Sequence, residues 1–143
     1  MKCSFDYKKW IILISFIGVL FSGYLTFTKI FIGYCPINEG CAILWGYPVC
    51  VYGLIMFLII FLSSLTFYFK KDLFNALVIT KVSFIGILFS LYYSIQEIFF
   101  TNTPVKYSLG LPTCVYGLAM YGAVFMIIIN SKIIKKFIFR KII

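Results

Sequence analysis

Four long apolar runs constrain this chain more than any other feature of its sequence. They cover roughly residues 10–33, 48–69, 73–100 and 113–134. At a rise of about 1.5 Å per residue, each run is long enough to cross a hydrocarbon core about 30 Å thick. The chain is 63% apolar and only 12% charged, which leaves too little polar surface for a water-soluble fold. We therefore predict an all-α integral membrane protein, a four-helix bundle that forms a single transmembrane domain over residues 1–143.

The positions of the basic residues predict the orientation of the bundle. Ten of the thirteen would lie on one side: Lys2, Lys8, Lys9, Lys70, Lys71, Lys132, Lys135, Lys136, Arg140 and Lys141. Because the side rich in Lys and Arg stays cytoplasmic, we expect a multi-pass protein of the cell membrane with both termini in the cytoplasm. The opposite loops, about 34–47 and 101–112, contain a single basic residue, Lys106. The net charge of +9 then reflects topology and attraction to anionic lipids, and no nucleic-acid partner is expected.

The two halves of the chain repeat each other. The segment FIGVLFS at 16–22 matches FIGILFS at 84–90, and PVCVYGLIM at 48–56 matches PTCVYGLAM at 112–120. Each repeat, about 10–69 and 73–134, contains two spans, so the two units have the same orientation and are related by an axis along the membrane normal. This symmetry predicts that Cys50 and Cys114 lie at one depth.

Four of the five cysteines, Cys35, Cys41, Cys50 and Cys114, fall on or near the predicted extracytoplasmic face, where disulfides persist. Cys50 and Cys114 each lie at the start of a predicted helix. There the unpaired backbone N–H groups and the positive end of the helix dipole favour a nucleophilic thiolate. Alternatively, the preceding prolines only start the helices, and the Cys-x-x-Gly segments let them pack closely. The gathering of four cysteines on one face favours thiol chemistry or structural disulfides.

The region from Cys35 to Leu54 resembles the first half of vitamin K epoxide reductase and its prokaryotic homologues. The shared order is Cys35, the stretch Pro-Ile-Asn-Glu-Gly, Cys41, a short apolar-aromatic segment, and then GYPVCVYGL at the start of the second span. The likeness covers most of residues 10–120 and is strongest over 33–57. It implies a four-helix core, two loop cysteines, and a Cys-x-x-Cys beside a quinone at the start of span four. It also implies electron transfer from thiol partners to the quinone, as in the functionally analogous DsbB.

By this resemblance, Cys35 and Cys41 would form the shuttle pair and Cys114 would be the first cysteine of the active-site motif. The second cysteine would fall at position 117, where this chain has Gly117. Cys50 occupies the symmetry-related position in span two and is the candidate replacement. Spans two and four are diagonal in a simple bundle, and a disulfide needs Cα atoms within about 7 Å. Two pairings therefore stay open: Cys35–Cys41 with Cys50–Cys114, or Cys41–Cys114 with Cys35–Cys50.

The implied function is that of a membrane thiol–disulfide oxidoreductase. It would pass electrons from an extracytoplasmic thioredoxin-like partner to a quinone, ubiquinone or menaquinone, and so support disulfide-bond formation. Tyr52, Tyr116 and Tyr121 are candidates to hydrogen-bond the quinone, although an aromatic belt at the membrane interface explains them as well. Glu97 is a candidate to relay protons to the reduced quinone or to pair with Lys29.

A second class of function fits the same sequence. Four spans joined by short loops also suit a non-catalytic scaffold or a small transporter, in which outer disulfides only cross-link the loops. The missing Cys-x-x-Cys favours this alternative. No metal site is expected, because the chain has no histidine and its cysteine spacing is unsuited to a metal.

Overall fold

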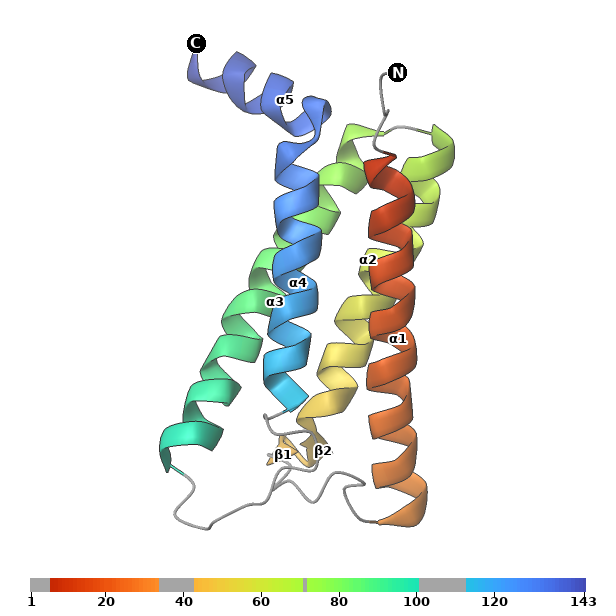
Figure 1. Ribbon diagram of the computed structural model, residues 1–143, viewed down its shortest axis with the longest axis vertical. Helices are drawn as coiled ribbons and strands as arrows, with labels where there is room; N and C mark the ends of the chain where they lie inside the picture. The colour runs from red at the N-terminus through yellow and green to blue at the C-terminus, as the bar shows by residue number, and fades with distance from the viewer. Residues whose placement is uncertain (1–5, 34–42, 71, 101–112) are drawn as a thin grey trace.

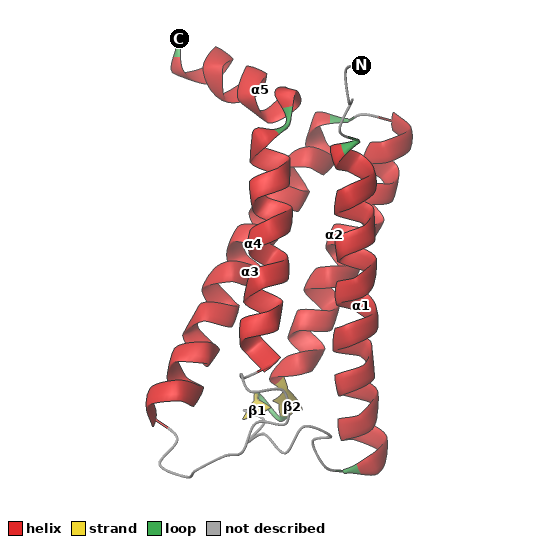
Figure 2. Ribbon diagram, in the orientation of Figure 1, coloured by secondary structure: helices red, strands yellow, loops and turns green. Residues whose placement is uncertain are grey.

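The computed structural model describes residues 6–33, 43–70, 72–100 and 113–143 of the chain. Its elements in order are α1 (Tyr7–Ile32), β1 (Ile43–Leu44), β2 (Tyr47–Pro48), α2 (Val49–Lys70), α3 (Leu73–Phe100), α4 (Thr113–Asn130) and α5 (Lys132–Ile142) (Figures 1 and 2). The predicted all-α four-helix bundle is confirmed. The helices α1 to α4 are each long and apolar enough to cross a membrane.

The four long helices pack as two antiparallel pairs. The most extensive contacts join α1 to α2 and α3 to α4, and the two pairs meet along α2–α3 and, less extensively, along α1–α4. The helices α2 and α4 therefore lie diagonally across the bundle. The start of α1 and the whole of α5 lie at one end, and the β1–β2 hairpin lies at the other (Figure 1).

Small residues in α1 and α3 let the helices of each repeat approach closely. A Cβ atom placed on Gly18 would lie 2.5 Å from the Phe57 ring, and one on Gly86 would lie 2.7 Å from the Tyr121 ring. Glycine at these two positions therefore makes room for an aromatic ring of the partner helix. Gly18 and Gly86 match each other in the sequence repeat, as do Phe57 and Tyr121, so the repeat has the same packing in both halves.

Further ring contacts follow the same symmetry. The Phe16–Phe61 and Phe84–Phe125 pairs within the repeats have centroid distances of 5.8 and 5.9 Å. The pairs that join the repeats, Phe21–Tyr116 and Tyr52–Phe89, both have centroids 6.2 Å apart. Since each pair occupies positions equivalent to those of its mate, the duplication is a property of the tertiary packing as well as of the sequence.

The bundle buries several small polar side chains among its core residues and exposes large apolar ones. Its buried polar side chains in the long helices are Ser15, Ser22, Thr26, Thr28, Ser64, Ser83, Ser90 and Ser94. Several satisfy themselves locally; the Ser15 hydroxyl, for example, donates to the Ile11 carbonyl at 2.7 Å. Large apolar side chains such as Leu20, Leu62 and Leu88 are more than half exposed. This distribution is typical of helices that pack through small residues and present apolar side chains to lipid.

The fourth long helix is shorter than the sequence predicted. The apolar run over 113–134 predicts one continuous span, but α4 ends at Asn130. Ser131 has an extended backbone (φ −64°, ψ 141°), and α5 begins at Lys132 as a separate helix that turns away from the bundle axis (Figure 1). Three polar residues, Asn130, Ser131 and Lys132, stand at the break, but two isoleucines follow them, so the predicted span extends beyond the end of α4.

A short β-hairpin, which was not predicted from the sequence, precedes α2. The strands pair antiparallel, with Leu44 opposite Tyr47, and the two turn residues Trp45 and Gly46 both have positive φ (51° and 85°). Two positive φ angles are typical of the primed turns whose twist matches a two-residue hairpin. Gly46 adopts this conformation easily, whereas Trp45 is an unusual residue for it. The hairpin positions the chain just before the first turn of α2.

Candidate functional site

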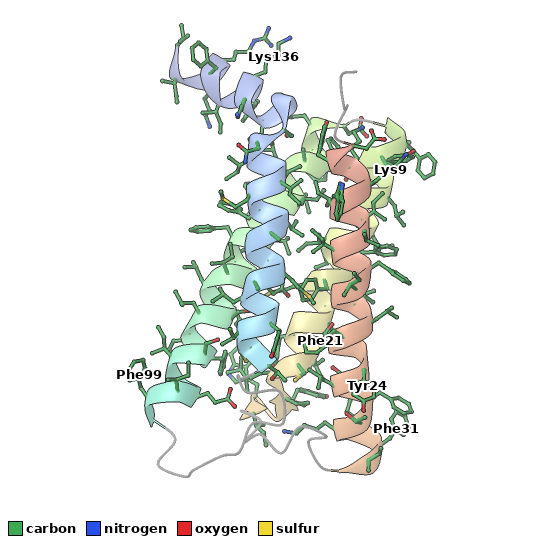
Figure 3. The ribbon with its side chains drawn as sticks, viewed as in Figure 1. Lys9, Phe21, Tyr24, Phe31, Phe99 and Lys136 are labelled. Atoms are coloured by element: carbon green, nitrogen blue, oxygen red, sulfur yellow. The ribbon has the colours of Figure 1, made fainter. Side chains whose placement is uncertain are left out.

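A small pocket lies inside the bundle at the end where α2 and α4 begin. Its volume is about 60 Å³, and all four long helices contribute to its lining. Phe21 points inward to this region, whereas Tyr24, Phe31 and Phe99 point away from the bundle (Figure 3). Lys9 and Lys136 lie at the opposite end of the molecule (Figure 3). The pocket is therefore far from the end that carries most of the described basic residues.

Two of the four predicted site cysteines line this pocket. Cys50 is the second residue of α2 and Cys114 is the second residue of α4, and both side chains are half-buried. Within the described residues, no disulfide joins one to the other. The other two, Cys35 and Cys41, lie outside the described residues, so both pairings remain predictions. The repeat thus brings two thiols, one from each half, to a single pocket.

One helical turn deeper than each cysteine, the pocket is lined by a glycine. A Cβ atom on Gly117 would lie 3.6 Å from the Ser90 hydroxyl oxygen, and one on Gly53 would lie 4.0 Å from the Tyr121 hydroxyl oxygen. Both distances are ordinary van der Waals contacts. Position 117 therefore lines the pocket and has room for a Cβ atom, as the cysteine that the resemblance implies there would require.

Tyr121 closes the pocket on the side toward the bundle centre. Its side chain is buried, and its ring stacks on Phe57 with centroids 4.2 Å apart and an interplanar angle of 10°. Its hydroxyl donates a hydrogen bond to the Gly53 carbonyl at 3.1 Å. Because Tyr121 belongs to α4 and the other two residues to α2, these contacts tie the diagonal helices together directly beneath the two cysteines.

The other predicted quinone-binding residues are not among the described residues that line the pocket. The Tyr52 hydroxyl donates to the Leu44 carbonyl at 3.1 Å, which fixes the hairpin onto α2. The Tyr116 ring packs edge-on against Phe21. Glu97 is half-buried near the end of α3. Of the four residues predicted to contact a cofactor, the structure brings only Tyr121 to the pocket.

Sequence reasoning overlooked two serines that line the pocket. Ser22 and Ser90 occupy equivalent positions in the repeat, and both are buried. The Ser22 hydroxyl donates to the Gly18 carbonyl at 2.7 Å. Each serine ends one copy of the repeated Phe-Ile-Gly-x-Leu-Phe-Ser segment, which sequence analysis used only as evidence of duplication. The same motif thus supplies the glycine that admits an aromatic ring and the serine that lines the pocket.

The symmetry breaks at the seam between α1 and α4, where an apolar groove opens on the side of the bundle. The groove has a volume of about 260 Å³, and the described residues that line it are Ile14, Ile17, Ala119, Met120 and Ala123. The positions equivalent to the two alanines in the first repeat are Ile55 and Ile59. The groove forms on the α4 side because alanine is much smaller than isoleucine.

The pocket is too small to enclose a quinone ring. An apolar cavity of about 150 Å³ accommodates benzene, whereas about 30 Å³ is the share of one water molecule in the liquid. A pocket of about 60 Å³ therefore has space for roughly two waters. Its mostly apolar lining suits a ring of this kind, but the space that the described residues enclose is smaller than a benzene-sized cavity.

No group of three His, Cys, Asp or Glu side chains that could hold a metal ion occurs within residues 6–33, 43–70, 72–100 and 113–143. Comparisons of the chain with known protein families, with curated proteins and with solved structures found no match. The resemblance to vitamin K epoxide reductase therefore rests on the sequence motifs alone.

Proposed function

We propose that this chain is a four-span membrane thiol–disulfide oxidoreductase whose reactive pair consists of Cys50 and Cys114. One observation carries the proposal: the first turns of α2 and α4 each bring a cysteine to the same small pocket. In the resembled family, the reactive cysteines lie one helical turn apart in span four. Here the second thiol would come from the equivalent position of the first repeat instead of from position 117.

The local environment favours reactive thiols. Each cysteine lies in the first turn of a long helix, where backbone N–H groups have no partner within the helix and the helix dipole favours negative charge. A thiolate is the nucleophile in thiol–disulfide exchange, so this placement promotes the reaction. Neither cysteine is fully buried, which is compatible with attack by another thiol.

Thiol–disulfide exchange between the partner and the chain conserves the total number of thiols and of disulfides. A thiolate of a reduced, thioredoxin-like partner attacks the Cys50–Cys114 disulfide, forms a mixed disulfide with one cysteine, and releases the other as a thiolate. The partner's second thiol then resolves the mixed disulfide. The partner leaves oxidised, and the chain holds two thiols with two more electrons and two more protons. By the resemblance, Cys35 and Cys41 would relay this exchange between the partner and the buried pair.

Reoxidation of the chain needs an acceptor of two electrons, for which the resemblance implies ubiquinone or menaquinone. The choice of acceptor rests on the resemblance, and reduction of quinone analogues is measured separately from thiol exchange.

The membrane placement follows from charge. Within the described residues, Lys8, Lys9, Lys70 and the basic helix α5 lie at one end of the bundle, and the thiol pocket lies at the other. The rule that basic residues stay inside would make the first end cytoplasmic and the pocket extracytoplasmic. Disulfide chemistry is favoured on that side, because the cytosol keeps thiols reduced.

The test is the trapping of a mixed disulfide on the purified protein in nanodiscs. In Cys50→Ser, Cys114 loses the cysteine with which it would pair. A thioredoxin-like protein whose second cysteine is replaced by serine cannot resolve a mixed disulfide, so with an added oxidant it should accumulate as a mixed disulfide at Cys114. The reciprocal variant should trap at Cys50, and Cys3→Ser serves as the control. If the double variant Cys50→Ser/Cys114→Ser exchanges as fast as the unmodified protein, these cysteines are not the reactive pair. Reduction of ubiquinone and menaquinone analogues is followed by absorbance in parallel.

The alternative, a non-catalytic scaffold or transporter, gains support from two observations. The pocket is small, and position 117 lacks the expected cysteine. This alternative predicts no mixed disulfide in any variant, and outer disulfides that resist reduction by dithiothreitol.

A further inference from the structure

The helix α5 leaves the bundle at the end opposite the thiol pocket. The extended backbone at Ser131 separates it from α4, and it projects sideways beyond the ends of the long helices (Figure 1). It keeps contacts with α4 and α3 near its start. Its position at the end of four candidate spans places it where the surface of a membrane would lie.

One stripe of α5 is apolar and becomes increasingly exposed toward the chain end. Ile134, Ile138 and Ile142 are spaced by four residues, so they share a face. Their exposed fractions are 3%, 44% and 79%. The first is covered by the bundle, whereas the other two extend past it. A stripe that continues from the protein interior outward suits a helix whose outer part lies against hydrocarbon.

A second face of α5 carries basic side chains. Lys135, Lys136 and Arg140 surround an open hollow of about 550 Å³, together with Phe139 and Ile143. The sequence of α5 contains five basic residues and no acidic one. A hollow with cationic sides and two apolar side chains is complementary to a phosphate group that continues into an apolar chain.

We propose that α5 is an interfacial helix that binds anionic phospholipids of the adjacent leaflet. The isoleucine stripe lies at the edge of the hydrocarbon, and Lys135, Lys136 and Arg140 contact the lipid phosphates. Charge decides between a lipid and a second copy of this chain. The same end of the bundle also carries Lys8 and Lys9, so two copies that met there would bring like charges together. The inference does not depend on the thiol chemistry.

The test uses hydrogen exchange of the full-length protein in nanodiscs, either with phosphatidylcholine alone or with a large share of phosphatidylglycerol. We expect the amides of α5 to be better protected in the anionic nanodiscs and the difference to shrink at high salt. The variant Lys136→Gln/Arg140→Gln should lower that protection on the order of 10- to 30-fold, since each basic residue near an anionic surface contributes about a fivefold effect.

The matched control is Lys9→Gln/Lys70→Gln, which removes two charges from the same end but outside α5 and should leave the protection of α5 unchanged. Ile138→Asn/Ile142→Asn should reduce protection in both kinds of nanodisc. The proposal is overturned by equal protection of α5 in the two lipids, or by an equal loss in the control. It is also overturned if protection depends on the number of protein copies per nanodisc, because that result identifies a second copy as the partner.

Discussion

The substitution Gly86→Ala tests the close approach of α3 and α4 beneath the thiol pocket. The added Cβ would lie 2.7 Å from two carbon atoms of the Tyr121 ring, whereas carbon atoms in contact are normally about 3.5–4.0 Å apart. The ring would have to retreat by about 1 Å. Its stack on Phe57 and its hydroxyl bond to the Gly53 carbonyl both resist that movement.

The cost is the sum of three terms. Overpacking a well-packed interior costs about 1–3 kcal/mol, and loss of the hydroxyl bond adds about 1 kcal/mol. The higher helix propensity of alanine offsets up to about 1 kcal/mol. We therefore expect the free energy of unfolding to fall by about 1–3 kcal/mol, which corresponds to a Tm lower by roughly 3–10 °C for a chain of this length.

The assay is thermal unfolding in detergent followed by the helical circular dichroism signal. The matched control is Gly122→Ala on the same bundle, because a Cβ atom there meets no other atom within 4 Å. It should leave the Tm unchanged or raise it slightly. In a Tyr121→Leu background, Gly86→Ala should cost much less, since the ring it would strike is gone. The reasoning fails if Gly86→Ala and Gly122→Ala give the same Tm, or if the cost of Gly86→Ala is equal in both backgrounds.

Three further predictions concern single contacts. Tyr121→Phe removes the hydrogen bond from the Tyr121 hydroxyl to α2 and should lower the free energy of unfolding by about 0.5–1.5 kcal/mol. The Tm should fall by a few degrees; an unchanged Tm would show that the hydrogen bond contributes nothing. The Lys8 ammonium group donates to the Phe67 carbonyl in the last turn of α2 at 3.2 Å and lies 4.6 Å from the centroid of the Phe67 ring. Lys8→Met removes both contacts and should lower the free energy of unfolding by about 1 kcal/mol. Lys9→Met is its control, because it breaks only a solvent-exposed ion pair and should leave the Tm unchanged. Gly117→Cys should fold normally and form a disulfide with Cys114 on oxidation, seen as the loss of two titratable thiols; a variant that fails to fold would contradict the room for a Cβ atom at this position.

The helices and the repeat could be predicted from the sequence because they depend on local properties. The length of each span follows from its apolar run, and equivalent residues such as Gly18 and Gly86 are found by aligning the two halves of the sequence. The break at Ser131 was missed, since serine is tolerated inside a helix and the isoleucines at 133 and 134 extend the apparent span past the polar residues at 130–132. The hairpin turn was also missed, because Trp45 is not a residue that signals a positive φ.

The candidate site was predicted in part. Cys50 and Cys114 were matched by the repeat, and the structure places both at one pocket. The selection among the tyrosines needed the tertiary structure. Only the packing of the helices shows that Tyr121 lines the pocket and that Tyr52 and Tyr116 do not.

By itself, the sequence determined that this protein is a duplicated bundle of four apolar helices with a cysteine at the start of the second helix of each repeat. These features depend on hydrophobicity, chain length and direct repetition, which are properties of neighbouring residues. The tertiary structure alone decided the size of the pocket, the bridge from Tyr121 to Gly53 and the groove beside Ala119 and Ala123. Those depend on how side chains from different helices fill the space between them, and a difference of a few carbon atoms is enough to open or close it.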